Sequence, residues 1–223
     1  MSTNSAPDEG SPWPKKTDRT RSRALKREAV MTMAVRFFNE KGFHATSLDD
    51  VAKALNVTKP TIYHYFRNKD EILFECVVQG LHSIADAAGR VEAQGGTGLE
   101  RLKSLAYMYA ICMTQDFCIC ISRTADHELS PASRARFRAL KREIDQTMRQ
   151  VIRDGIADGT IAPESERMIS FTLAGALNWI ARWFDPEGPM SREEVAQSVV
   201  SILMNGVAAE AGRGTPVRAP ESS

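Results

Sequence analysis

The chain has 223 residues, 43% of them hydrophobic and 26% charged, which is the composition of a globular protein with a sizeable core. No apolar run approaches the ~20 residues of a membrane span, and residues 1–20 hold no apolar signal region, so we expect a cytoplasmic protein. The net charge is only +1, but residues 15–69 carry 13 Lys and Arg against 5 Asp and Glu, and the remainder carries 16 against 23. This asymmetry predicts a polyanionic partner for the N-terminal part; a solvated basic face is the alternative.

The first 41 residues divide into an arm and a helix. Residues 1–20 are rich in Ser, Pro and charge, and we interpret them as a disordered basic arm. Apolar residues then recur at helical spacing from about Ser22 to Lys41, and Gly42 is a typical residue to end that helix.

Two short helices are predicted next, separated by a sharp turn. Ser47 is a good N-cap for the helix that contains LDDVAKAL. Asn56 tolerates the left-handed conformation that a sharp turn needs, and Val57 is expected to plug the turn into the core. Thr58 is expected to cap the third helix, with Pro60 in its first turn, where a missing N–H costs nothing.

The third helix, within VTKPTIYHYF, is aromatic and basic. Ile62 and Phe66 are spaced to face a core together. Five residues are then left to point outward: Lys59, Thr61, Tyr63, His64 and Tyr65. Side chains of these types donate to phosphates and reach base edges in a major groove, as in a helix-turn-helix DNA reader. A helical hairpin of a bundle with exposed tyrosines is the alternative.

The stretch TSLDDVAKALNVTKPTIYHYFRNKDEIL (46–73) resembles the signature of TetR-family transcriptional regulators, and the similarity extends over about residues 25–75. The resemblance implies a homodimer with an N-terminal three-helix DNA-binding domain at 21–68 and a helical ligand-binding and dimerisation domain at 69–210. The polar residues that follow predict a disordered tail at 211–223. Asn56 and Pro60 stand where the family often has glycine, so no operator sequence is transferred.

The same resemblance assigns roles in binding double-stranded operator DNA. Positions that match phosphate contacts are Thr46, Ser47, Thr58, Tyr65 and Lys69. Positions that match base-facing residues are Lys59, Pro60, Thr61 and His64, and Tyr63 matches a position that contacts backbone or base. The basic residues of the arm are expected to reach a minor groove or nearby phosphates, or else to act as a solubilising tail: Lys15, Lys16, Arg19, Arg21 and Arg23.

Only helical patterns follow Lys69, so we expect an all-α fold. The predicted helices are 70–93, 99–121, 131–158, 164–184 and 191–209. The segment 99–121 is apolar on most faces and is expected to be one central helix. The last two helices carry apolar faces, which predict either internal core or, as the family implies, a dimer interface.

The segment ALNWIARWFDPEGPMSREEVA (176–196) resembles a TetR branch whose members often control the breakdown of fatty acids, steroids or aromatic acids, several of them in response to acyl-CoA thioesters. A small hydrophobic effector of this kind is therefore expected. The predicted pocket residues are Tyr107, Met108, Ile111, Cys112, Arg123, Phe171, Asn178, Trp179, Arg182 and Trp183. The tryptophans could equally be core or interface anchors, and the arginines surface residues.

We do not expect an enzyme, a cofactor or a metal, because the sequence has no nucleophile, phosphate-loop or zinc-protease motif. Cys118 and Cys120, with His127 nearby, match no standard zinc spacing, so the cysteines are interpreted as buried apolar residues. A ligand-released repressor is therefore predicted. An efflux or detoxification regulator that senses a drug-like compound is the alternative, and an architectural DNA binder or a cryptic enzyme is more remote.

Overall fold

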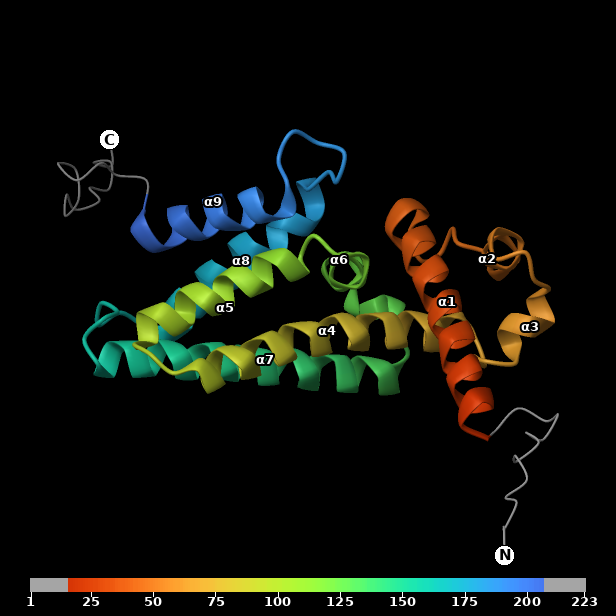
Figure 1. Cartoon of the computed structure of the whole chain (residues 1–223), viewed down its shortest axis with the longest axis horizontal. Helices are drawn as coiled ribbons and strands as arrows, with labels where there is room; N and C mark the ends of the chain where they lie inside the picture. The colour runs from red at the N-terminus through yellow and green to blue at the C-terminus, as the bar shows by residue number, and fades with distance from the viewer. Residues whose placement is uncertain (1–15, 207–223) are drawn as a thin grey trace, which may run out of the picture. The chain divides into compact units, whose positions relative to one another are not determined.

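The computed structural model describes residues 16–206, with side chains described from residue 20 except at 92 and 94, and this part of the chain is all-α, as predicted. Figure 1 shows the helices in chain order. They are α1 Lys16–Lys41, α2 Leu48–Ala54, α3 Lys59–Tyr63, α4 Lys69–Gln94, α5 Gly98–Cys112, α6 Asp116–Arg123, α7 Pro131–Ala157, α8 Glu166–Trp183 and α9 Arg192–Asn205, with a short 3₁₀ turn at Asp126–Glu128.

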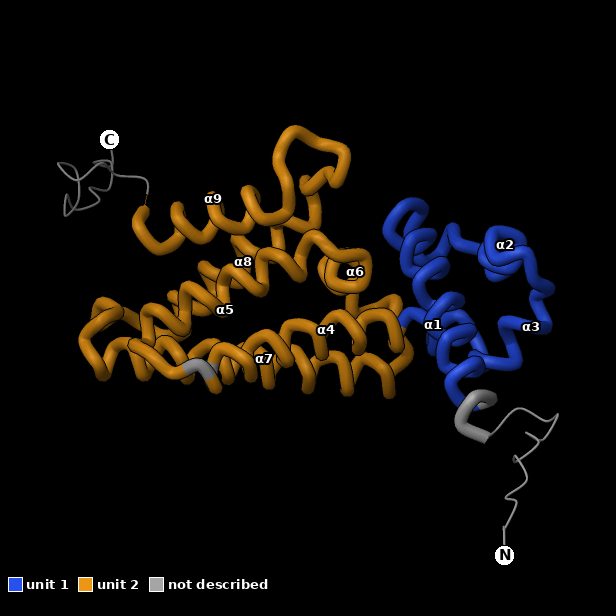
Figure 2. Tube along the Cα trace, in the orientation of Figure 1, with its two compact units in different colours: residues 1–73 blue, residues 74–223 orange. Residues whose placement is uncertain are grey.

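The described residues form two compact units that divide between Leu73 and Phe74 (Figure 2). Unit 1 contains α1, α2, α3 and the start of α4, and unit 2 contains the rest. The domain limits drawn from the sequence stay predictions, because α4 runs through both units without a break.

Unit 1 is a three-helix domain built around a small apolar core. Val35, Phe38, Val51, Ile62 and Phe66 are buried in it, so each helix contributes one apolar face. Burial of side chains this size contributes about 1.5–3 kcal/mol each. α1 begins at Lys16, earlier than predicted, so residues 16–20 of the predicted disordered arm are helical. The predicted disordered arm falls largely on residues 1–15, which lie outside the described residues, as do residues 207–223 with the predicted tail.

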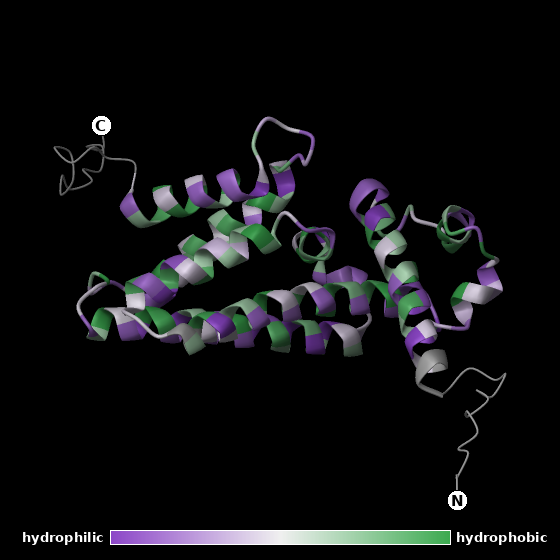
Figure 3. Ribbon diagram, viewed as in Figure 1, coloured by the Kyte–Doolittle hydropathy of each residue, from purple (hydrophilic) through white to green (hydrophobic). Residues whose placement is uncertain are grey.

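Unit 2 is a helical bundle in which α5 packs on α7, α8 and α9. Hydrophobic and hydrophilic positions alternate along its helices (Figure 3), as expected for amphipathic helices around one core. The prediction of one helix over 99–121 is wrong. The chain bends by 89° between α5 and α6. The Thr114 hydroxyl donates to the carbonyl of Ile111 (2.7 Å), and Gln115 is extended.

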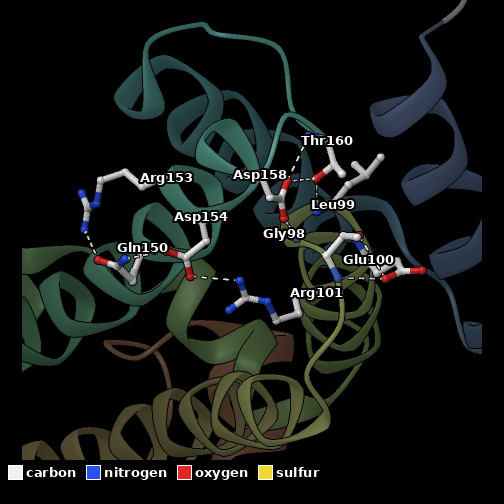
Figure 4. A network of polar contacts seen from close by, with 10 residues as sticks. Gly98, Leu99, Glu100, Arg101, Gln150, Arg153, Asp154, Asp158 and Thr160 are labelled. Atoms are coloured by element: carbon white, nitrogen blue, oxygen red, sulfur yellow. Dashed lines mark hydrogen bonds and ion pairs between the residues drawn. The ribbon is translucent and has the colours of Figure 1, made fainter.

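Amides at the start of α5 are held by side chains from the end of α7 (Figure 4). The Gly98 N–H donates to Asp158 (2.7 Å), and the Leu99 N–H donates to the Thr160 hydroxyl (3.1 Å). The helices approach so closely here that a Cβ on Gly98 would lie 2.1 Å from the Cα of Gly155. The first amides of a helix have no partner within it, so these bonds fix α5 against α7.

Among the described residues, no single helix is both long and apolar enough to cross a membrane. Only α5 and α6 taken together, bent as they are, pass a test of length and composition.

Candidate DNA-binding surface and ligand cavities

The turn between α2 and α3 has the geometry that the sequence predicts. Ser47 caps α2 by accepting the Asp49 N–H at 3.1 Å. Asn56 adopts φ 54°, the left-handed conformation. Val57, however, is 39% exposed and does not plug the turn. The carbonyl of Ala52 accepts the Val57 N–H at 2.9 Å, so backbone bonding closes the turn instead.

Thr58 precedes α3 as predicted, but its hydroxyl caps no backbone amide. Pro60 has no N–H to offer, and the Thr58 hydroxyl pairs instead with the hydroxyl of Thr61 at 3.0 Å. The hydroxyls of Thr58 and Thr61 therefore lie together on the exposed surface at the N-terminal end of α3.

The faces of α3 are arranged as the spacing predicts. Ile62 and Phe66 are buried, and the Arg27 guanidinium lies 4.5 Å from the Phe66 ring centre. Five predicted DNA-contact residues are exposed, namely Thr58, Pro60, Thr61, Tyr63 and His64, while Lys59 and Tyr65 are half-buried. The outward face of α3 therefore carries hydroxyl, imidazole and ammonium groups, which suit contacts to phosphates and base edges.

Lys59 is joined to α2 by an ion pair. Its ammonium group donates to Asp49 over 2.7 Å, and about half of each side chain is exposed to solvent (42% and 52%). The hydrogen bond to Lys59 is the main cause that lowers the pKa of Asp49, and the same bond raises the pKa of Lys59. A contact between Lys59 and DNA therefore requires this pair to open.

Lys69 and Thr46 are turned into the link between α1 and α2. The Lys69 ammonium donates to the carbonyls of Phe43 (2.7 Å) and Thr46 (3.0 Å) and lies 4.4 Å from the Phe43 ring centre. Burial lowers the pKa of Lys69. The buried Thr46 hydroxyl donates to Gly42 at 2.8 Å. The Thr46 hydroxyl is therefore bonded within the protein, and a phosphate contact by the Lys69 ammonium group would require its carbonyl bonds to break.

The basic arm is described only in part. Arg21 and Arg23 lie exposed on α1, whereas Lys15 and the side chains of Lys16 and Arg19 lie outside the described part. Contacts between the arm and DNA stay a prediction.

Unit 2 contains a cavity of about 720 Å³ with one apolar side and one charged side. Apolar groups come from α4, α5, α6, α7 and α8, including Ile84, Tyr109, Ile121, Met148 and Phe171. The Tyr109 hydroxyl donates to the Asn178 side chain at 3.0 Å, and burial is the main cause that raises the pKa of Tyr109. We call this the α7–α8 cavity. Its charged lining residues are Asp126, Arg138, Lys141, Arg142, Asp145 and Arg149.

The cations of this cavity exceed its carboxylates. Asp126 accepts from Arg138 at 2.6 Å, which is the main cause that lowers the pKa of Asp126. Asp145 pairs with Arg149 at 2.7 Å, yet the Nε of Arg149 is buried without a hydrogen-bond partner among the described residues. Arg142 forms no hydrogen bond or ion pair within the described chain. The cavity can therefore hold an apolar group next to an anion.

The ten residues predicted for a ligand pocket do not share one cavity. Only Phe171 and Asn178 line the α7–α8 cavity. Tyr107 and Met108 line a second cavity between α4, α5 and α9, while Ile111 packs against the core and Cys112 is buried in it. Arg182 donates to the carbonyl of Ser122 (2.8 Å), and Arg123 donates to that of Ala181 (3.4 Å), so both tie α6 to α8.

The predicted tryptophans lie on a groove between α8 and α9. Trp179 is 64% exposed and Trp183 48% exposed. The groove measures about 430 Å³ and its remaining lining residues are Gly175, Ala176, Ile180, Val199, Ile202 and Leu203. An exposed face of this size and apolarity marks an interaction surface.

Four cations of the α7–α8 cavity were missed from the sequence: Arg138, Lys141, Arg142 and Arg149. The sequence signal for three of them, Arg138, Lys141 and Arg142, is the basic stretch RARFRALKR (134–142) near the start of α7. The four cysteines are buried, and the described residues include no cluster of His, Cys, Asp and Glu suited to a metal.

Comparisons with known proteins agree on one family. Residues 30–76 match the family "Bacterial regulatory proteins, tetR family", and residues 95–207 match "Tetracyclin repressor-like, C-terminal domain". A crystal structure of a TetR/AcrR-family transcriptional regulator from Thermobifida fusca is 30% identical, with a TM-score of 0.66, and the match covers 83% of this chain and all of that one.

Two further relatives extend over most of the chain. AibR, in a crystal structure with isovaleryl coenzyme A and operator DNA, is 25% identical with a TM-score of 0.72, and the match covers 80% of this chain and 98% of AibR. The HTH-type transcriptional repressor KstR2 of Rhodococcus jostii is 26% identical over 205 residues, which are 87% of this chain and 97% of KstR2. With its helix-turn-helix and helical C-terminal unit, the chain belongs to the TetR family and is a DNA-binding transcriptional regulator, not an enzyme.

Proposed function

We propose that this regulator is a homodimeric repressor that leaves its operator when an amphipathic anion, an acyl-CoA thioester, binds the α7–α8 cavity. The observation that carries the proposal is the chemistry of that cavity, where an apolar side meets more cations than carboxylates. An acyl chain matches the apolar side, and the phosphates of coenzyme A match Arg142 and the unpartnered Nε of Arg149. The similarity to AibR, whose structure contains isovaleryl coenzyme A, supports the same class.

Dimer formation is proposed through α8 and α9. Trp179, Trp183 and Ile202 are exposed on these helices around the apolar groove, and a symmetry-related copy would cover the same groove on both subunits. The two recognition helices α3 would then enter major grooves about 34–36 Å apart on a palindromic site. Repression is supported by the similarity to the repressor KstR2, and a cytoplasmic location is consistent with a DNA-binding regulator.

Helix α4 offers a route from ligand to DNA. It begins at Lys69, directly after the helix-turn-helix, and its residues Leu81 and Ile84 contribute to the lining of the α7–α8 cavity. We infer that α4 has two positions, only one of which lets the protein bind DNA. A ligand that binds the other position more tightly shifts the population towards it, and the difference in ligand affinity limits the loss of DNA affinity.

The test compares operator release by a panel of acyl-CoAs in the wild type and in Arg142→Gln. DNA binding is measured by fluorescence anisotropy at fixed salt. We expect an acyl-CoA to release the wild type and Arg142→Gln to need about tenfold more of it, while binding DNA equally well without ligand. Arg153→Gln is the matched control, because Arg153 lies on the same helix, pairs with Glu166 and does not line the cavity.

Two outcomes would overturn the proposal. Release by neutral drug-like compounds but by no acyl-CoA would favour a regulator of efflux or detoxification. Equal sensitivity of wild type and Arg142→Gln to the acyl-CoA would place its phosphates elsewhere in the protein.

A further inference from the structure

Unit 2 contains a second cavity, which is lined by other residues than the α7–α8 cavity. It measures about 600 Å³ and lies between α4, α5 and α9, and none of its lining residues lines the α7–α8 cavity. We call it the α5–α9 cavity. Its apolar lining residues are Ala87, Val91, Tyr107, Met108, Val200 and Met204. A volume of this size lies within the range of small-molecule sites.

Two cations lie at one end of the α5–α9 cavity. α4 and α5 follow one another through the short link 95–97, and Arg90 stands near the end of α4 while Lys103 stands near the start of α5. Both therefore lie towards the link. Asn205, at the end of α9, adds an amide to the lining residues. The apolar and polar parts of the wall are thus contributed by all three helices.

These cations are unpaired, unlike most cations of the other cavity. Within the described residues, neither Arg90 nor Lys103 forms an ion pair or a side-chain hydrogen bond, and the lining includes no carboxylate. The nearby Glu100 accepts from the N–H (2.9 Å) and the hydroxyl (3.0 Å) of Thr97, and the charge of Lys103 acts on it only as a minor cause of its lowered pKa, without an ion pair. Two unpaired cations beside an apolar cavity complement a single anionic head with an apolar tail.

We propose that the α5–α9 cavity is a second small-molecule site, for a medium-chain carboxylic acid. The carboxylate pairs with Arg90 and Lys103, and the alkyl chain lies along Val91, Met108 and Val200. We assign a free acid to this site because two cations, Arg90 and Lys103, complement one carboxylate. The inference does not depend on the acyl-CoA proposal, which concerns the other cavity.

The test measures binding of radiolabelled decanoate to the full chain by equilibrium dialysis. Saturable binding is expected, and Arg90→Gln/Lys103→Gln should weaken it by about tenfold or more. Ser201→Trp should block it by filling the cavity from the exposed side of α9, where the substitution disturbs no core packing. Arg153→Gln, at a residue that lines neither cavity, is the matched control and should bind decanoate like the wild type, and Arg142→Gln reports on the α7–α8 cavity. Decanol, which lacks the charge, should bind about tenfold or more weakly than decanoate.

Three results would overturn the inference. The first is that decanoate does not bind saturably. The second is that the wild type, Arg90→Gln/Lys103→Gln and Ser201→Trp bind decanoate equally. The third is that only Arg142→Gln loses decanoate binding. The last result would place decanoate in the α7–α8 cavity. The acyl-CoA proposal is tested separately by operator release, and its failure would not change the interpretation of the decanoate-binding results.

Discussion

The Lys59 ammonium group donates to the Asp49 carboxylate over 2.7 Å, which joins the recognition helix α3 to α2. The pair lies on the surface that we expect to meet DNA, and it places a negative charge there. Exposed pairs of this kind contribute little to stability, so the pair can open when a phosphate competes for the lysine.

The ion pair predicts opposite effects for its two members on DNA affinity. Asp49→Asn should strengthen operator binding, because it removes a negative charge from the surface and frees Lys59. Lys59→Ala should weaken binding and lower the slope of log affinity against log salt by about one if Lys59 reaches a phosphate. Both are measured by anisotropy over a salt series. If Asp49→Asn leaves affinity unchanged, the pair does not restrain Lys59.

Lys69 is predicted to stabilise unit 1 in the free protein, because its carbonyl bonds must break before its ammonium group can bind a phosphate. Lys69→Met should lower the free energy of unfolding by about 1–3 kcal/mol, because the carbonyls of Phe43 and Thr46 lose their donor. Chemical denaturation measures this effect. The opposite pattern, unchanged stability with a salt slope lowered by about one, would restore Lys69 as a phosphate contact.

The close crossing of α5 and α7 predicts a contrast between glycines. Gly98→Ala should destabilise by about 1–3 kcal/mol, since its Cβ would meet the backbone of Gly155. Gly89→Ala is the matched control. It lies in α4 with open space around its Cβ, and should stabilise the chain by about 0.5–1 kcal/mol. Equal thermal unfolding temperatures for both variants would contradict the crossing geometry.

Asp158 predicts a loss of stability in acid. Hydrogen bonds from the Thr160 hydroxyl and then the Gly98 N–H lower the pKa of its carboxyl group in the folded state. The stabilisation is therefore full above the unfolded pKa and disappears as pH falls through the lower folded pKa, below about pH 4. Unfolding measured from pH 7 to pH 2 should show a smaller acid-induced loss for Asp158→Asn. An identical loss in variant and wild type would remove Asp158 as a contributor.

The α8–α9 face predicts that a buried charge prevents dimer formation. Trp179→Asp should produce monomers in sedimentation velocity, because the carboxylate would be buried in an apolar interface. Leu25→Asp changes an equally exposed apolar residue of unit 1 and should leave the oligomeric state unchanged. A wild-type monomer, or a dimer that tolerates Trp179→Asp, would rule out this interface.

The reader was predictable because its signals are local. The Ser47 cap, the left-handed Asn56 and the buried pair Ile62 and Phe66 each follow from residue type and short spacing. The break between α5 and α6 was missed, because no Gly or Pro interrupts the segment at 113–115.

The ligand residues were harder to predict because long-range packing brings them together. Tyr107 and Asn178 were placed in one pocket on the basis of residue type, yet they face different cavities. Arg142 could not be assigned from its own helix, since basic residues on an amphipathic helix are usually solvated. Only the packing of α7 against α8 places it at an apolar wall.

The most direct test is a selection of random duplex DNA on the purified protein at a stated salt concentration, read by sequencing and repeated with a panel of acyl-CoAs and free acids. We expect a palindromic motif, with half-sites about one helical turn apart, that is lost when one acyl-CoA is added. A palindrome that no acyl-CoA affects would contradict the proposed effector, and the absence of any enriched motif would contradict sequence-specific repression itself.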